Sequence, residues 1–111
     1  MSFDPLDNYL RMYRKRAELS QDEVAHLLGL ESGTMISRYE FGTREPTLEA
    51  ALALEALFGV PVRELFAGRF KKTRKKVKKR ARKLVRKWHR LELGTRFHQK
   101  LDTLIALIQS P

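Results

Sequence analysis

The sequence has 111 residues, which is room for one small domain and a helical appendage but not for two full cores. Apolar residues make up 42% and charged residues 32%, so a modest core can form, and the absence of cysteine excludes disulfides, thiolate zinc sites and a cysteine nucleophile. The net charge of +10 arises in the C-terminal part, because residues 1–68 carry 7 Lys/Arg against 11 Asp/Glu whereas residues 69–111 carry 16 against 2.

Three helices are predicted in the first part of the chain. The first has an apolar face at spacings of 4, 3 and 4, formed by Leu6, Leu10, Tyr13 and Ala17. The second begins at Ser20, which has Glu23 three residues later, at the spacing of a capping box. The third begins with Ser32 or Thr34 as its cap and ends at Gly42.

Two more helices complete the N-terminal domain. Thr47 is placed to cap a fourth helix, which ends at Gly59, and Pro61 sits at the first turn of a short fifth helix over residues 62–66. These residues show no sustained alternation of β-branched side chains, so strands are not expected. We therefore predict an all-α domain over residues 1–68.

The segment after residue 68 follows a different pattern. Residues 69–90 hold 14 Lys/Arg and no acid. The apolar residues, interrupted by Arg74, fall into a seven-residue repeat made of Phe70, Val77, Ala81, Leu84, Trp88 and Leu91. This repeat predicts a helix over residues 70–92. Gly94 is placed to stop it and Thr95 to cap the next helix, so we expect a basic helical hairpin over residues 69–111.

Five stretches of the N-terminal domain carry a longer pattern. They read LSQDEVA (19–25), LGL (28–30), ISRYEFG (36–42), REPTL (44–48) and FGVPVRELF (58–66). In these residues the chain resembles the phage-repressor (Cro/repressor, XRE) helix-turn-helix family, over residues 6–66. The stretch between Gly29 and Glu40 is one residue longer than the usual pattern, which predicts an enlarged turn before the third helix.

The resemblance implies that the third helix is a recognition helix, which lies in the major groove of DNA and reads bases with its outward side chains. The base-reading residues implied are Ser32, Gly33, Thr34, Ser37 and Arg38. Arg38 is suited to a two-pronged contact with guanine. Apart from the resemblance, Ser32 and Thr34 fit helix caps equally well, and Arg38 fits a solvated surface residue.

Further roles follow from the same resemblance. Gln21, at the amino end of the second helix, is placed on a phosphate, and Arg44 is expected to be a second phosphate clamp. Arg14 and Glu40 are expected to form an internal ion pair. Glu55 stands where the family often has a small apolar residue, and it either faces solvent or pairs with an arginine of the first helix.

Enzymatic and metal-binding roles are not supported by the sequence. The three histidines, His26, His89 and His98, lie on different elements without a metal-ligand spacing. There is no glycine-rich phosphate loop and no serine in a nucleophile-elbow context. We therefore expect a protein that is not an enzyme, with no metal and no cofactor.

The basic helix fits the backbone of DNA or RNA, where counterion release adds affinity. The expected phosphate-binding residues are Lys71, Lys72, Arg74, Lys75, Lys78, Lys79 and Arg82. An anionic membrane surface and a solvated charge run are the alternatives, but the apolar stripe is narrow and unrelieved like charge on one helix is costly. Nucleic acid is the favoured partner, and no membrane partner is expected.

The last helix is the favoured dimer surface, because two copies of the basic helix would repel each other. Its apolar side chains cover two adjacent faces, and the expected dimerisation residues are Phe97, Leu101, Leu104, Ile105 and Ile108. A homodimer would place two recognition helices one DNA turn apart, as the reading of a pseudo-palindrome requires.

These observations predict a sequence-specific regulator of transcription that binds double-stranded DNA, with a C-terminal basic arm adding affinity for the phosphate backbone. Two alternatives stay open: a non-specific, nucleoid-type nucleic-acid-binding protein, and an antitoxin-like module whose C-terminal hairpin binds a protein partner. The start of the chain lacks a signal-peptide pattern, and no stretch approaches the roughly 18 apolar residues of a membrane span. A cytoplasmic, nucleoid-associated location is therefore expected.

Overall fold

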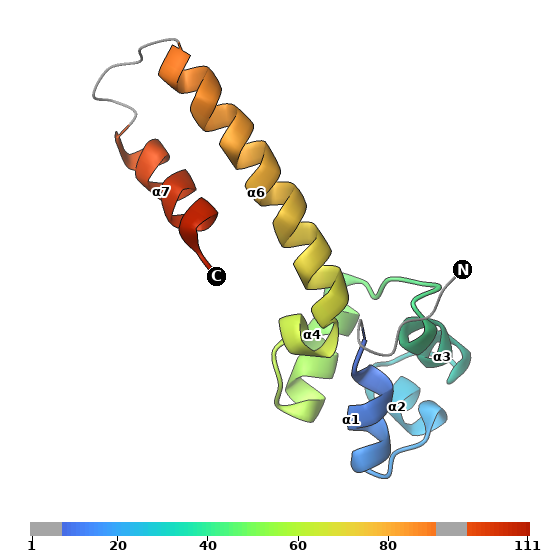
Figure 1. Cartoon of the computed structure of the whole chain (residues 1–111). Helices are drawn as coiled ribbons and strands as arrows, with labels where there is room; N and C mark the ends of the chain where they lie inside the picture. The colour runs from blue at the N-terminus through green and yellow to red at the C-terminus, as the bar shows by residue number, and fades with distance from the viewer. Residues whose placement is uncertain (1–7, 91–97) are drawn as a thin grey trace. The chain divides into compact units, whose positions relative to one another are not determined.

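The computed structural model describes residues 8–90 and 98–111, and over these residues the chain is all α, as predicted (Figure 1). The chain divides into two compact units, residues 1–70 and 71–111. The helices are α1 (Leu10–Arg16), α2 (Gln21–Leu27), α3 (Thr34–Phe41), α4 (Leu48–Phe58), α5 (Val62–Leu65), α6 (Ala67–Arg90) and α7 (His98–Gln109).

The first unit closes around one small apolar core, to which each of its first five helices contributes. The buried core residues are Leu10, Val24, Ala25, Ile36, Tyr39, Ala50, Leu54 and Leu65. The backbone N–H of Tyr9 donates to the carbonyl of Leu65 over 2.8 Å, which joins the start of α1 to the end of α5. Helices as short as these are only marginally stable by themselves in water, so their stability depends on packing around this shared core.

Local capping residues set two of the helix starts, as predicted. Ser20 Oγ accepts from the backbone N–H of Glu23 over 3.0 Å, and Glu23 Oε1 accepts from the backbone N–H of Ser20 over 2.8 Å. Thr47 Oγ1 accepts from the N–H of Ala50 over 3.1 Å. Each cap satisfies backbone donors that the helix itself leaves unpaired.

Left-handed glycines follow the ends of α3 and α4, also as predicted. Gly42 has φ 73° and Gly59 has φ 68°. A side chain is disfavoured in this conformation, so glycine at these two positions lets each helix stop and the chain reverse.

Two predicted boundaries are wrong. Neither Ser32 nor Thr34 caps α3: the cap position is Gly33, and α3 makes no side-chain cap bond of its own. The basic helix was predicted to begin at residue 70 but begins at Ala67, so that only Phe66 separates it from α5. The predicted positions Leu6, Leu91, Gly94 and Thr95 lie outside the described residues.

In the second unit, one side of α6 is covered, and a hydrogen bond joins this side to the end of α7. Lys78 Nζ donates to the carbonyl of Ser110 just after α7, and this contact fixes which side of α6 faces α7. The covered side is a line of buried and half-buried residues at spacings of 4, 3, 4 and 3, formed by Arg74, Lys78, Ala81, Val85 and Trp88. Of the seven-residue apolar repeat, Ala81 and Trp88 lie on this side, whereas Val77 and Leu84 stay 42% and 40% exposed.

The capping box generates a pH prediction. The hydrogen bond from the Ser20 backbone, then that with the Ser20 side chain, lowers the pKa of Glu23 below its ordinary value of 4.5. A lowered carboxyl pKa contributes stability that is present above the unfolded pKa and is lost as pH falls through the folded pKa. Replacing Glu23 with Gln, which keeps an acceptor but does not ionise, should therefore lower stability at neutral pH.

The measurement is denaturant melting of the wild-type protein and Glu23→Gln over a pH series. The difference in unfolding free energy should shrink once the pH falls below 4.5. Glu31→Gln, which removes an exposed charge outside the capping box, is the control. A difference between wild type and Glu23→Gln that is constant with pH would contradict the prediction.

Candidate nucleic-acid interface

The outward face of α3 presents most of the predicted base-reading residues. Ser32, Thr34 and Arg38 are exposed, and Ser37 is half-buried. Ile36 and Tyr39, on the same helix, are buried in the core. Alternation between core and surface at helical spacing gives α3 one anchored face and one polar face.

Gly33 differs from the other residues of this set. It is buried, and its backbone N–H donates to Asp22 Oδ1 over 2.7 Å. Its position is therefore a packing contact between α2 and α3, and its surroundings do not support the base-reading role expected for it.

The expected ion pair between α1 and α3 is formed and is deeply buried. Arg14 Nε donates to Glu40 Oε2 over 2.5 Å, and Arg14 Nη2 donates to Glu40 Oε1 over 3.2 Å. The residues are 8% and 2% exposed. Arg14 Nη1 also donates to the carbonyl of Leu19, over 3.0 Å, so the guanidinium is bonded on several sides. A buried charge pair requires this kind of complete hydrogen bonding.

Gln21 extends this network to α2. Its Nε2 donates to Glu40 Oε1 over 3.2 Å, and the side chain is half-buried. The amide therefore has one bond inside the protein, while the Gln21 carbonyl oxygen and second N–H are not committed to that bond. The family resemblance implies that Gln21 binds a phosphate. The structure adds the hydrogen bond from Gln21 to Glu40 inside the protein.

The turn after α3 places Arg44 on the surface. The hydroxyl of Thr43 and the backbone N–H of Arg44 both donate to the carbonyl of Arg38, over 3.2 and 3.3 Å. The turn thus folds back on the last turn of α3, with Arg44 exposed beside it. Glu45, next in the chain, pairs with Arg69 over 2.5 Å, and both side chains are largely exposed.

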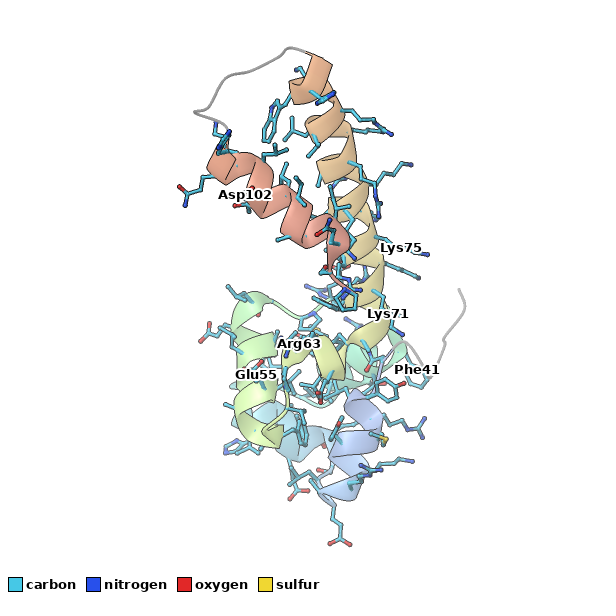
Figure 2. The ribbon with its side chains drawn as sticks, turned by 60° about the vertical axis from the view of Figure 1, so that its left-hand side comes forward. Phe41, Glu55, Arg63, Lys71, Lys75 and Asp102 are labelled. Carbon is cyan, nitrogen blue, oxygen red and sulfur yellow. The ribbon has the colours of Figure 1, made fainter. Side chains whose placement is uncertain are left out.

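Most of the basic side chains of α6 are exposed. The exposed Lys and Arg residues are Arg69, Lys71, Lys72, Lys75, Lys76, Lys79, Arg80, Arg82, Lys83, Arg86 and Lys87. Figure 2 labels Lys71 and Lys75, one helical turn apart. The predicted phosphate ligands do not include Lys76, Arg80, Lys83, Arg86 and Lys87, although the same basic segment contains them.

Two of the predicted phosphate ligands, Arg74 and Lys78, are half-buried on the covered side of α6. The Lys78 ammonium is bonded to the Ser110 carbonyl. Desolvation first, then the neighbouring charges of Arg74 and Arg82, lower the pKa of Lys78. A phosphate contact by Lys78 would therefore compete with its contact to the end of α7.

Glu55 has a role that its sequence position did not reveal. Its Oε1 accepts from the backbone N–H of Val62 over 2.9 Å, so Glu55 caps α5 from α4. Figure 2 labels Glu55 on α4. Glu55 is exposed, as the first of the two predicted alternatives has it, but neither alternative includes this bond. A cap supplied from another helix leaves no local signal, since Glu55 and Val62 are seven residues apart.

The described residues contain no cluster of His, Asp or Glu side chains that could hold a metal ion. Over the same residues, no helix is long and apolar enough to cross a membrane.

Comparison with known proteins identifies the fold of the first unit. A helix-turn-helix family profile, HTH_3, matches residues 10–65, which is half of the chain. The chain belongs to the repressor-type helix-turn-helix family. This is the family that the sequence resembles, and its members are DNA-binding regulators of transcription rather than enzymes.

Two relatives align with this helix-turn-helix domain. The cryptic phage CTXphi transcriptional repressor RstR of Vibrio cholerae is 39% identical over 56 residues, which are 50% of this chain and 50% of the relative. The uncharacterized HTH-type transcriptional regulator MJ0272 of Methanocaldococcus jannaschii is 33% identical over 61 residues, 55% of this chain and 91% of the relative. The chain thus spans half the length of the Vibrio relative. No solved structure matches.

Proposed function

We propose that this helix-turn-helix protein is a sequence-specific regulator of transcription in which α3 reads bases and α6 binds the phosphate backbone. The observation that carries the proposal is the exposed polar face of α3, held from behind by the buried Arg14–Glu40 pair. A helix fixed in this way keeps its outward side chains at constant positions, as base recognition requires. Such a protein would act at the nucleoid.

Arg38 is the proposed main base-reading residue. Its side chain is exposed in the last turn of α3, and a guanidinium can bond to both major-groove acceptors of guanine. Exposed Ser32 and Thr34, with half-buried Ser37, supply hydroxyls to bases or phosphates on the same side. The proposed phosphate clamps of this domain are Gln21 and Arg44.

The proposed role of α6 is affinity without sequence information. Five of the predicted phosphate ligands, Lys71, Lys72, Lys75, Lys79 and Arg82, are exposed. Because the first 68 residues have more acidic than basic side chains, non-specific attraction to DNA must come largely from this helix.

We also propose that the protein acts as a homodimer through α7. No residue of α7 is buried in the single chain. Leu101, Leu104 and Ile108 are half-buried and Ile105 is 36% exposed, so apolar area remains for a second copy. Phe97, predicted to join them, lies outside the described residues.

The first test is selection of bound sites from a random pool of DNA duplexes. The wild-type protein should enrich a pseudo-palindrome. Arg38→Ala should lose one guanine preference in each half-site, at a cost of about 1–3 kcal/mol, with little change in affinity for random DNA. No enrichment by the wild type would favour the non-specific alternative, and equal losses of Arg38→Ala on selected and random duplexes would make Arg38 a phosphate clamp.

The second test concerns the arm in the full-length protein. Replacing exposed Lys71, Lys72, Lys75 and Lys79 with Gln should reduce the slope of log K against log salt by about 3 to 4 for each bound protomer, at roughly 0.9 per phosphate contact. Preference among sequences should be kept, because phosphate contacts carry little base information.

The matched control for the arm variant replaces three exposed cations of α1, Arg11, Lys15 and Arg16, with Gln. This control should leave the salt slope nearly unchanged. An unchanged slope in the α6 variant would contradict the proposal and would direct attention to a protein partner of the hairpin.

A further inference from the structure

The start of α3 has no cap from its own sequence. Gly33 occupies the cap position with φ −68° and ψ −7°, and no side-chain cap bond is made. The nearest local hydroxyl, Ser32 Oγ, lies 3.4 Å from the N–H of Thr34, beyond the usual length of such a bond. Both α2 and α4 carry their own caps. The first backbone N–H groups of α3 therefore need a hydrogen-bond acceptor from another part of the chain.

Asp22, in the first turn of α2, provides that partner. Its Oδ1 accepts the N–H of buried Gly33 over 2.7 Å, a short bond to a carboxyl oxygen. A Cβ added at Gly33 would lie 2.8 Å from both the backbone N of Asp22 and the backbone C of Gln21. The two backbones thus touch at this point, and only glycine leaves room for the contact.

The neighbouring residue of α2 holds the other end of α3. Gln21 Nε2 donates to Glu40 Oε1 over 3.2 Å, in the last turn of α3. Gly33 and Glu40 are seven residues apart, which is about 10 Å along a helix axis. Two adjacent residues of α2 therefore hold α3 at both ends, so that α3 has little freedom to slide or rotate against α2.

We infer that Asp22 is a positioning residue for base recognition: its bond to the Gly33 N–H fixes the start of α3, where Ser32, just before the cap, and Thr34, the first residue of the helix, are exposed. This inference rests on the proposed function of α3. Loss of the bond strands a buried donor and releases the first turn, while Glu40 still holds the last. Asp22 therefore governs the preference among sequences and leaves phosphate affinity unchanged.

The experiment compares affinities for the duplex selected by the wild-type protein and for a random duplex. Asp22→Ala removes the acceptor, whereas Asp22→Asn removes the charge and keeps an acceptor oxygen. Asp22→Ala should lower the ratio of the affinity for the selected duplex to that for the random duplex by on the order of tenfold, which is the effect of losing about one good base contact. The affinity for the random duplex should change little. Asp22→Asn should keep most of the wild-type ratio.

Ser20→Ala is the matched control for loss of stability. It breaks a cap of α2 two residues from Asp22 but leaves the acceptor of Gly33 intact. It should lower the melting temperature and keep the ratio of affinities. A second measurement needs no DNA: hydrogen exchange at the Gly33 amide should be slow in the wild type and Asp22→Asn, and faster in Asp22→Ala.

The inference would be overturned if Asp22→Ala kept the wild-type ratio of affinities for the selected and random duplexes. It would also be overturned if either Asp22→Asn or Ser20→Ala lowered that ratio as much as Asp22→Ala does. A wild-type protein that shows no preference between duplexes contradicts the proposed function itself. In that case, if hydrogen exchange at the Gly33 amide is still slow in the wild type and faster in Asp22→Ala, the bond between Asp22 and Gly33 is a structural contact with no part in recognition.

Discussion

The buried ion pair of Arg14 and Glu40 is the interaction on which the arrangement of the first unit depends. Removing two charges from water is costly, and the structure offsets this cost with two bonds between them and with the Leu19 carbonyl and the Gln21 amide. These bonds join α1, α2 and α3 at one point. Any movement of α3 would therefore strand a buried charge, which couples the stability of the domain to the position of α3.

In the proposed function, the chain separates base reading from binding of the phosphate backbone, two tasks that one surface can also combine. The first 68 residues have an excess of acid, so they attract DNA weakly by charge alone, whereas α6 exposes a long series of cations. Base contacts give sequence information and phosphate contacts give affinity. In the proposed function, the arm would raise the concentration of the reading domain near DNA without altering which bases are preferred.

Features specified by neighbouring residues were predictable from the sequence. The Ser20 capping box, the Thr47 cap and the glycines after α3 and α4 depend on spacings of a few residues, which periodicity reveals. Features supplied across the fold were not. The caps given by Asp22 to α3 and by Glu55 to α5, and the line of α6 that faces α7, depend on which helices meet in space, and local patterns do not encode that.

A double-mutant cycle on Arg14 and Glu40 tests most directly whether one buried pair organises the domain. Each single change to Ala strands the partner charge and should cost about 3 kcal/mol in denaturant melting. The double variant strands neither, so its cost should be close to that of one single variant, which gives a coupling energy of about 2–3 kcal/mol. Additive costs, with coupling below about 0.5 kcal/mol, would contradict this account.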